Sequence, residues 1–488
     1  MRRRRPYDLA VLGGGTAGLV AAHGAAGLGA RVVLIERHEQ TGGDCLWTGC
    51  VPSKSLIAAA ELAHRMRRAD AIGLAPVEPE IDFAQVMAHV HGARRRIEPQ
   101  DSVERLRASG VDVVHGAARF AGPGQVVVDD RHALSFRAAL IATGSSPIIP
   151  PIDRLQDAHP LTNETVWDLR ELPRRLVVLG GGPVGCELAQ AFARLGSDVA
   201  LVEMAAGLLG KEEPEAQALI AERLRGEGVD VRIATEALRV EGLAGESGRL
   251  VVERDGQEGS LPFDRILVAT GRRPQTADLG LETIGVEVDD QGAVEVDATL
   301  RTTAKRIFAA GDVTGSLPFT HVAGHHGRTV VGNALFHIRR SFTTDAVPWV
   351  TFTDPEVGRV GLTEQQARRR FGDRVAIAHQ CYEDLDRAVT AGLPYGFAKL
   401  VGGPRGRLVG ATVAAPAGGE AIAGLAMRVA AGDAIGDLSR QVHAYPTFAE
   451  GPARAADDHL RTRWLTPSVR RFTRPVLGLL RAVDGGSS

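Results

Sequence analysis

The sequence predicts an α/β protein in which one nucleotide-binding fold occurs twice and a third region follows. The first observation is an apolar segment, 7–12, followed by the glycine-rich run 13–18, a small-residue helix and a second apolar segment that ends in Glu36. The second is the recurrence of this pattern from 176 to 203, with the glycines and the closing glutamate at identical spacing. The third is the length of 488 residues, which is too great for one hydrophobic core.

The composition is that of an ordinary globular protein and argues against several function classes. The formal net charge is −2, so no basic excess favours nucleic acid. No apolar run reaches the roughly 18 residues needed to span a bilayer, so no integral membrane segment is expected. Arginines at 2–5 precede Pro6-Tyr7-Asp8 where a signal peptide needs an apolar core. Four cysteines in so long a chain argue against a secreted disulfide scaffold, and we expect a cytoplasmic protein.

The first repeat is typical of a dinucleotide-binding turn, for which the alternative is a plain tight turn. Gly13, Gly15 and Gly18 form a G-x-G-x-x-G pattern between a predicted strand and a predicted helix that runs to about residue 28. Such glycines let the backbone approach a pyrophosphate at the helix N-terminus. Glu36 closes the second strand and can accept a hydrogen bond from a ribose hydroxyl.

The second repeat places Gly180, Gly182, Gly185 and Glu203 at the corresponding positions, with a predicted helix to about residue 195. Two such folds imply two dinucleotides, one bound tightly and one exchanging. Glu203 would accept from a free ribose 2′-hydroxyl and would repel a 2′-phosphate. Since no arginine follows within a few positions, NADH is favoured over NADPH.

Between the repeats lies the stretch 42–54, which holds Cys45 and Cys50, two of the four cysteines. Pro52 and the apolar run 56–66 predict that Cys50 lies at a helix N-terminus, where the macrodipole favours a thiolate. Lys54 adds positive charge one turn later. A redox pair, two buried structural cysteines and half of a zinc site all remain open at this point, although the spacing is not the usual C-x2-C.

The other elements are predicted from apolar runs and from turn residues. A charged helical region is expected over 81–107. Strands are expected at 111–114, 126–128, 138–141, 266–269, 307–310, 347–352, 396–401 and 408–413. Helices are expected around 421–431. The tail, 466–488, is interpreted as a packed or frayed terminus in preference to an amphipathic helix that touches a membrane or a partner.

Specific motifs carry a resemblance that covers nearly the whole chain. They are Gly42-Gly43-Asp44-Cys45 through Cys50-Val51-Pro52-Ser53-Lys54, the two glycine turns, Ala269-Thr270-Gly271-Arg272, Ala310-Gly311-Asp312, Thr353-Asp354-Pro355-Glu356-Val357 and Gly361-Leu362-Thr363-Glu364. The chain resembles the FAD-dependent pyridine nucleotide-disulfide oxidoreductases, the group of dihydrolipoamide dehydrogenase, glutathione reductase and mercuric reductase. Glu383-Asp384-Leu385-Asp386-Arg387-Ala388 resembles the mercuric reductase-like branch in particular.

The resemblance implies a fold with two Rossmann-like domains and a C-terminal α+β dimerisation domain. It implies an FAD domain at 1–150 and 272–345, an NAD(P) domain at 151–271, a dimer interface domain at 346–465 and a tail at 466–488. Each active site of the homodimer would be completed by the C-terminal part of the partner subunit. The residues implied to hold FAD are Gly13, Gly15, Gly18, Glu36, Gly43, Lys54, Gly116, Thr143, Gly144, Asp312 and His321. Those implied to hold NAD(P)H are Gly180, Gly182, Gly185, Glu203 and Gly271.

The resemblance also implies an electron path. Lys54 would pair with Glu187 near the flavin, Cys50 would face the flavin, and Cys45 would meet the acceptor. Hydride would pass from nicotinamide to flavin, and the flavin would then reduce the Cys45–Cys50 disulfide. Cys186 is interpreted as a packed core residue, and no role is assigned to Cys381. His325 and His326 are interpreted as surface or capping residues.

The chain departs from the family pattern on the acceptor side. Disulfide-reducing members end in His-Pro-Thr-x-x-Glu, in which the histidine is the base for the outer thiol and the glutamate orients it. Here the base position is Tyr445, Glu450 is retained, and His443 lies two residues early. A tyrosine with a pKa near 10 is a poor base at neutral pH, which would slow dithiol–disulfide exchange roughly 10²- to 10⁴-fold.

Thiolates bind soft metal ions directly and need no such base. Mercuric reductases resemble this chain in carrying tyrosine here, but they also have a C-terminal cysteine pair, and no cysteine follows Cys381. Three hypotheses follow. The first is a mercuric reductase-like enzyme whose acceptor is a metal ion such as Hg(II), a quinone or a disulfide. The second is a dihydrolipoamide dehydrogenase with a substituted base, and the third is a redox-sensing flavoprotein without turnover.

Overall fold

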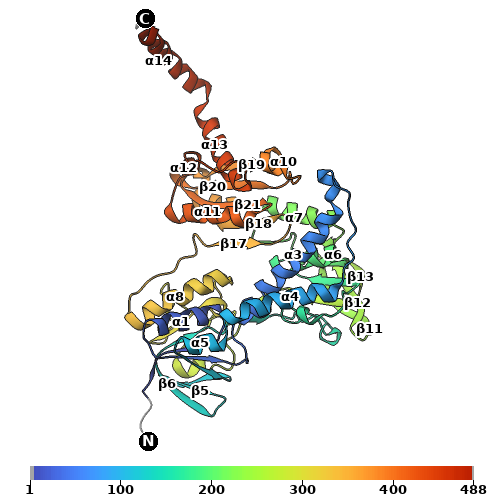
Figure 1. Ribbon diagram of the computed structural model, residues 1–488, viewed down its shortest axis with the longest axis vertical. Helices are drawn as coiled ribbons and strands as arrows, with labels where there is room; N and C mark the ends of the chain where they lie inside the picture. The colour runs from blue at the N-terminus through green and yellow to red at the C-terminus, as the bar shows by residue number, and fades with distance from the viewer. Residues whose placement is uncertain (1–4, 486–488) are drawn as a thin grey trace. The chain divides into compact units, whose positions relative to one another are not determined.

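The computed structural model describes residues 5–485, which form two compact units (Figure 1). Unit 1 comprises the chain up to Gly210 together with Ala221–Thr344. Unit 2 comprises Lys211–Ile220 together with the chain from Asp345 onward. Helix α7 (Pro214–Gly226) therefore begins in unit 2 and ends in unit 1.

Unit 1 contains a parallel sheet with the strand order β3-β2-β1-β6-β16. Its strands are β1 (Tyr7–Leu12), β2 (Val32–Glu36), β3 (Val111–His115), β6 (His132–Ile141) and β16 (Ile307–Ala309). Strands β4 (Ala118–Gly122) and β5 (Gln125–Val128) extend the N-terminal half of β6 as an antiparallel meander. The predicted strands at 7–12, 111–114, 126–128 and 138–141 are confirmed.

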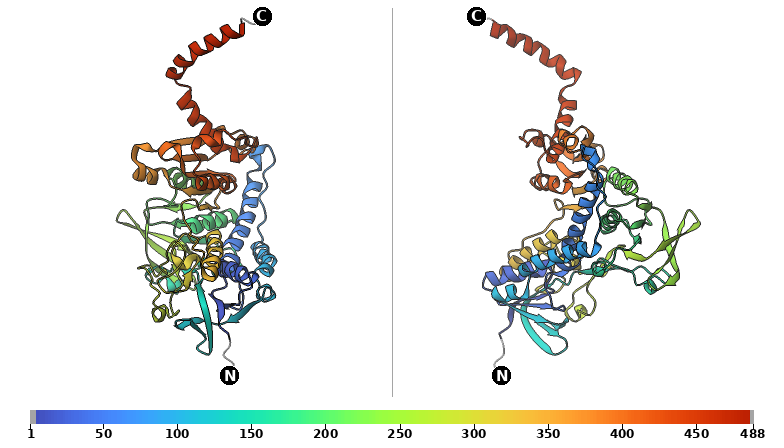
Figure 2. Two further views of the ribbon diagram at one scale, coloured as in Figure 1. Left: turned by 90° about the vertical axis from the view of Figure 1, so that its left-hand side faces the viewer. Right: turned by 45° about the vertical axis from the view of Figure 1, so that its right-hand side comes forward.

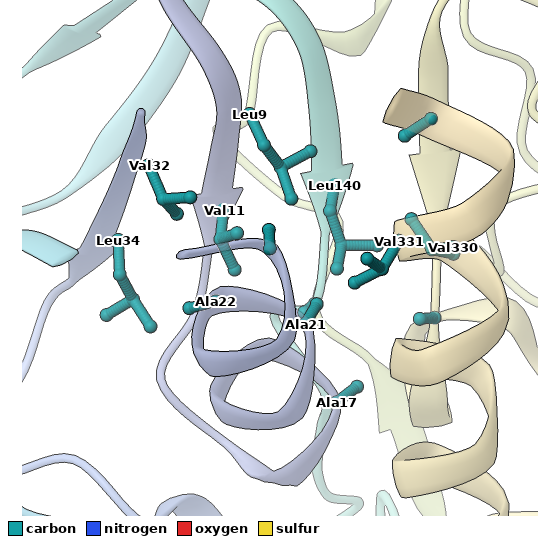
Figure 3. Packing of buried hydrophobic residues seen from close by; sticks show 14 of the residues in the cluster. Leu9, Val11, Ala17, Ala21, Ala22, Val32, Leu34, Leu140, Val330 and Val331 are labelled. Carbon is teal, nitrogen blue, oxygen red and sulfur yellow. The ribbon is translucent and has the colours of Figure 1, made fainter. Parts of the chain in front are cut away.

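Helices α1 (Thr16–Gly27) and α8 (Thr320–Phe336) pack together beside this sheet (Figure 3). The side chains of α1 that face the sheet and α8 are small, as Ala17 and Ala21 illustrate, and both are nearly or fully buried. They contact the cluster that holds Val11, Leu140 and Val330. Because alanine adds little bulk, α1 lies close to the strand that precedes it, which sets the position of the glycine turn between them.

A second parallel sheet in unit 1 repeats the first in smaller form, with the order β10-β9-β8-β14. Its strands are β8 (Arg175–Leu179), β9 (Asp198–Val202), β10 (Asp230–Arg232) and β14 (Arg265–Val268), and α6 (Pro183–Leu195) follows β8. Strands β11 (Glu236–Ala244), β12 (Ser247–Arg254) and β13 (Gln257–Phe263) form an antiparallel sheet, visible in Figure 2. Strands β7 (Ser145–Pro147) and β15 (Arg272–Pro274) pair with each other.

The remaining helices of unit 1 are α2 (Gly43–Trp47), α3 (Cys50–Arg67), α4 (Phe83–Ile97) and α5 (Val103–Ala108). The prediction of one helical region over 81–107 is wrong in one respect, because the chain breaks between α4 and α5. Pro99 follows α4, and the Ser102 hydroxyl caps α5 by accepting the Arg105 N–H at 3.3 Å. The serine supplies a new helix start that a search for continuous amphipathicity overlooks.

Unit 2 is built on one antiparallel sheet with the order β17-β18-β21-β20-β19. Its strands are β17 (Pro348–Thr351), β18 (Glu356–Gly361), β19 (Ala376–Cys381), β20 (Phe397–Gly402) and β21 (Leu408–Ala415). Its helices are α9 (Glu364–Phe371), α10 (Asp386–Thr390), α11 (Gly418–Ala431), α12 (Ile435–Ser439) and α13 (Gly451–Trp464). This region is α+β, as predicted, with Ile422 and Leu425 of α11 buried in its core.

The tail forms a long helix, α14 (Pro467–Gly485). The interpretation of the tail as a packed or frayed terminus is therefore wrong for its described part. From Arg470 to Asp484 every residue is exposed, although the segment is helical throughout. Within residues 5–485, no helix combines the length and the apolar character needed to cross a membrane.

Candidate active site

The first glycine turn joins β1 to α1 and is held by the acid that ends β2. A Cβ atom on Gly18 would lie 2.0 Å from the Gly13 carbonyl oxygen, so only glycine fits where the helix passes the strand. The Glu36 carboxylate is nearly buried and accepts the Gly14 N–H at 2.6 Å and the His38 N–H at 3.0 Å. Glu36 thus fixes the turn, in addition to the predicted role toward a ribose.

The second glycine turn reproduces these contacts. A Cβ atom on Gly185 would lie 1.9 Å from the Gly180 carbonyl oxygen. The Glu203 carboxylate accepts the Gly181 N–H and the Ala205 N–H, each at 2.6 Å. The repeat recognised in the sequence is therefore also a repeat of hydrogen bonds.

Both turns fit the pyrophosphate of a dinucleotide. The N-cap of α1 is Gly15 and that of α6 is Gly182, and neither has a side chain that could occupy the first-turn N–H groups. Those N–H groups and the macrodipole favour an anion. No atom lies within 4 Å of a Cβ built on Gly182, so the space beside that turn is open.

The other residues implied to contact FAD lie in unit 1 around the first turn. Gly116 follows β3, Thr143 and Gly144 follow β6, and Asp312 lies in a single 3₁₀ turn after β16. The Asp312 carboxylate accepts the Ser145 hydroxyl at 2.7 Å, and burial raises its pKa. The ring of His321, the second residue of α8, stacks on Phe319 with 5.4 Å between centroids.

The cysteine stretch is attached directly to the first turn. The Gly42 N–H donates to the Gly14 carbonyl at 2.9 Å. Gly43 packs so closely on Gly15 that a Cβ atom on Gly43 would lie 2.6 Å from the Gly15 Cα. This contact positions α2, which carries Cys45, beside the predicted flavin turn.

Cys50 is the first residue of α3, which confirms the prediction that it lies at a helix N-terminus, and the helix begins two residues before Pro52. Pro52 still lies in the first turn, where its missing N–H leaves no hydrogen bond unmade. The Cys50 Sγ lies 3.5 Å from the hydroxyl of Thr320, which is the first residue of α8. The sulfur therefore lies near the N-termini of two helices, and both macrodipoles favour its thiolate.

The two cysteines are free thiols in this structure, and their acidities diverge. A hydrogen bond from Cys45 lowers the pKa of Cys50 to about 6, assisted by the Thr320 hydroxyl and the charge of Lys54 and opposed by burial. The same hydrogen bond, together with burial, raises the pKa of Cys45. The pair is thus arranged as a thiolate at Cys50 and a thiol at Cys45.

Lys54 and Glu187 form the ion pair that the resemblance implies, with 2.7 Å between Nζ and Oε2. Lys54 lies on α3, between the two repeats, and Glu187 lies on α6, within the second repeat. The Glu187 side chain is 6% exposed and the Lys54 side chain 34% exposed. The pair therefore connects the cysteine helix to the second nucleotide fold.

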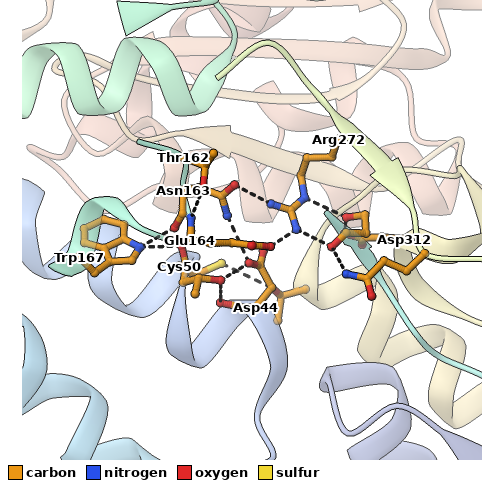
Figure 4. Close-up of polar contacts among 12 residues, drawn as sticks. Asp44, Cys50, Thr162, Asn163, Glu164, Trp167, Arg272 and Asp312 are labelled. Carbon is orange, nitrogen blue, oxygen red and sulfur yellow. Dashed lines mark hydrogen bonds and ion pairs between the residues drawn. The ribbon is translucent and has the colours of Figure 1, made fainter. Parts of the chain in front are cut away.

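Arg272 organises a network that the sequence did not reveal (Figure 4). Its guanidinium donates to the Ser145 hydroxyl at 2.8 Å and to the Asn163 amide oxygen at 2.9 Å, and it lies 3.4 Å from Asp44. Asp44 precedes Cys45, and Ser145 donates to Asp312. Arg272 belongs to one of the family motifs, but no role could be assigned to it from the sequence, because its partners lie more than 100 positions away in the chain.

The interpretation of His326 as a surface residue is wrong, although its ring does accept a backbone N–H, as a capping residue would. It is 1% exposed, and its Nδ1 accepts the Gly311 N–H at 3.2 Å. Burial lowers the pKa of His326 to about 4, so the ring is neutral at pH 7. It supports the backbone that carries Asp312.

Tyr445 and Glu450 lie in unit 2 and belong to one polar cluster. The Tyr445 hydroxyl donates to the Asp386 carboxylate at 2.7 Å. Arg454 donates to Glu450 at 2.7 Å and lies 3.2 Å from Asp386. The hydrogen bond to Asp386 raises the pKa of Tyr445, although the side chain is exposed. The cluster joins the mercuric reductase-like segment 383–388 to the C-terminal segment.

The remaining cysteines and His443 have other environments. Cys186 is fully buried in α6, as predicted, and burial raises its pKa. Cys381 is exposed at the end of β19, and partial burial raises its pKa. His443 Nε2 lies 3.2 Å from the Leu438 carbonyl oxygen.

Comparisons with known proteins agree with this geometry. Residues 7–327 match the model of the pyridine nucleotide-disulphide oxidoreductase family, and residues 347–456 match its dimerisation domain. A mercuric reductase from Streptomyces lividans is 39% identical over 92% of this chain and 95% of its own. A dihydrolipoyl dehydrogenase from Thermus scotoductus is 36% identical over 93% of this chain and 97% of its own.

A similar solved structure is the Cu(II) complex of the HOCl-induced flavoprotein disulfide reductase RclA from Escherichia coli. It is 29% identical, covers 93% of this chain and 99% of its own, and has a TM-score of 0.81. Likeness in sequence and in structure therefore extends over both units.

Proposed function

Because this chain belongs to the pyridine nucleotide-disulphide oxidoreductases, which bind FAD and use NAD(P)H, we propose that it reduces a thiophilic metal ion at Cys45 and Cys50. The first glycine turn, with Gly13, Gly15, Gly18 and Glu36, would hold FAD, which would supply two-electron transfer from the nicotinamide to the cysteine disulfide. With Hg(II) as acceptor, NAD(P)H and Hg(II) yield NAD(P)⁺, one proton and elemental mercury. The dithiol binds the ion and returns to the disulfide as the metal is reduced.

The observation that carries the proposal is the hydrogen bond from Tyr445 to Asp386. A base for thiol–disulfide exchange must accept a proton near neutral pH. The Tyr445 hydroxyl instead donates a hydrogen bond to the Asp386 carboxylate. This contact raises the pKa of Tyr445 further from neutrality. Cys45 also has a raised pKa. Exchange with an organic disulfide would therefore be slow, whereas a metal ion displaces the thiol proton without a positioned base.

The names of the relatives do not distinguish the acceptors, since a mercuric reductase and a dihydrolipoyl dehydrogenase are similarly close. The Cu(II) complex of RclA makes Cu(II) a second ion to test. A quinone remains the alternative acceptor without a thiol-exchange step, and a redox sensor would show no turnover at all.

The test is anaerobic NADH oxidation with Hg(II), Cu(II), oxidised lipoamide and a quinone in turn. The flavin spectrum is recorded first to establish loading. We expect turnover with a metal ion to exceed that with lipoamide about 100-fold or more, from the loss of general-base catalysis. Lipoamide turnover as fast as metal turnover would refute the proposal, as would a quinone that outpaces every metal ion.

A substitution tests the role of Tyr445 directly. Tyr445→His should raise lipoamide turnover by at least tenfold, because a histidine can accept a proton at pH 7. Tyr395→His is the matched control, since Tyr395 also donates to an aspartate, Asp354, at 2.7 Å in the same unit. Equal changes in both variants would mean that position 445 has no special role.

Further parts of the proposal concern the cofactor, the assembly and the location. NADH is preferred, since Glu203 presents a carboxylate at the end of β9. The chain acts as a homodimer whose sites are shared between subunits, which the dimerisation domain supports. A cytoplasmic location agrees with a cysteine pair that must cycle between dithiol and disulfide.

A further inference from the structure

The last helix, α14, has two chemically different faces. At 3.6 residues per turn, six of its seven large apolar side chains fall within an arc of about 100°, and the seventh, Leu477, falls beside the arginines. Its arginines fall within a second arc of about 100° on the opposite side. The apolar arc consists of Val469, Phe472, Val476, Leu479, Leu480 and Val483. The basic arc consists of Arg470, Arg471, Arg474 and Arg481.

Apart from Val469, which is half-buried, the apolar arc is exposed in the described chain. Phe472 is 76% exposed, Leu479 is 71% exposed and Leu480 is 51% exposed. A 19-residue helix is only marginally stable by itself in water, and Pro475 interrupts its hydrogen-bond ladder. Burying the apolar arc against a surface would stabilise both the side chains and the helix.

The charge of the helix indicates what that surface is. Asp484 is the only acidic residue of α14, against four arginines. An apolar arc opposite a basic arc is typical of helices that lie in the interface of an anionic bilayer. Long arginine side chains reach from the helix toward lipid phosphates while the apolar side enters the acyl region. Trp464, 60% exposed just before α14, adds an aromatic side chain suited to the headgroup level.

We propose that α14 is a peripheral membrane-binding helix, which lies flat on an anionic lipid surface and holds this flavoenzyme there. The helix does not cross the bilayer, in agreement with the absence of a spanning helix among residues 5–485. The proposal concerns the location of the enzyme and does not depend on which acceptor the cysteine pair reduces.

The test is flotation of the full-length, FAD-loaded protein with lipid vesicles. We expect binding to vesicles that contain phosphatidylglycerol, weak binding to pure phosphatidylcholine, and loss of binding as salt rises. The variant R471Q/R474Q should bind about thirtyfold more weakly, from about 1 kcal/mol for each arginine near the surface. The control R369Q/R370Q removes the same charge from two exposed arginines of α9 and should bind like the wild type.

The apolar arc is tested by L479Q/L480Q, which should abolish flotation without changing flavin content. Three results would overturn the proposal. The first is a wild-type protein that does not float with anionic vesicles. The second is equal weakening in R471Q/R474Q and R369Q/R370Q. The third is an L479Q/L480Q variant that floats normally but sediments as a smaller species, which would make α14 a contact between subunits.

Discussion

Replacing Cys45 with alanine should raise the pH at which Cys50 ionises by about 1 to 2 units. The largest influence that lowers the pKa of Cys50 to about 6 is the hydrogen bond from Cys45. A hydrogen bond to a charged group contributes about 1.5–3 kcal/mol, and 1.36 kcal/mol corresponds to one pKa unit. Cys45→Ser is the control, because a serine hydroxyl still donates, and its ionisation should stay near that of the native pair.

The assay is a pH titration between 5 and 9, followed by the ultraviolet absorbance of the thiolate. In flavin-loaded protein, the long-wavelength absorbance of a thiolate beside the flavin is a second signal. Cys186 and Cys381 do not interfere, since burial raises the pKa of each. The thiolate fraction of Cys50 must increase with pH, because the charged form is the deprotonated one. Identical midpoints for Cys45→Ala and Cys45→Ser would refute the reasoning.

Three further predictions concern the nucleotide folds. Glu203→Arg should shift the ratio of kcat/KM values toward NADPH, and an unchanged ratio would contradict the role given to that carboxylate. Gly18→Ala should lower flavin content, whereas Gly185→Ala should keep flavin and raise the KM for NADH. In each variant the added Cβ would lie about 2 Å from a carbonyl oxygen of its own glycine turn. Loss of flavin in both variants would argue against two separate nucleotide sites. Lys54→Met should lower the free energy of unfolding in urea by about 2 kcal/mol. This is less than is usual when a fully buried ion pair is broken, because the Lys54 side chain is one-third exposed. Lys54→Arg keeps the charge and should lower the free energy of unfolding by less.

The parts of the fold that could be predicted are those whose signal is local. Strands β1 and β8 each end where an apolar run meets glycine, and the spacing from Gly13 to Glu36 returns from Gly180 to Glu203. The break between α4 and α5 was not predicted. The signal for it is a single serine, Ser102, whose hydroxyl caps α5, and the sequence around it otherwise indicates continuous helix. The divisions between the nucleotide domains remain predictions.

The candidate site likewise contains contacts that the sequence predicts and contacts that it does not. The ion pair between Lys54 and Glu187 followed from the family motif, although the two residues lie 133 positions apart. The Arg272 network and the hydrogen bond from Tyr445 to Asp386 did not follow, because each joins segments far apart in the chain through side-chain geometry alone. The sequence revealed that the base position is a tyrosine, but only the structure reveals that its proton is engaged.

The observed hydrogen bonds of Glu203 and the role toward ribose proposed for it would together constrain how coenzyme preference can evolve in this protein. Its two carboxylate oxygens already hold the Gly181 and Ala205 N–H groups, and the same oxygens would face the ribose. A lineage that exchanged this acid for a basic side chain would release both amides at once. An intermediate ancestor would therefore need a new acceptor for those amides before the exchange, so the order of mutations matters. The same reasoning applies to Glu36, which holds the Gly14 and His38 N–H groups in the turn proposed to bind flavin. Replacing Glu36 would release both of these amides as well.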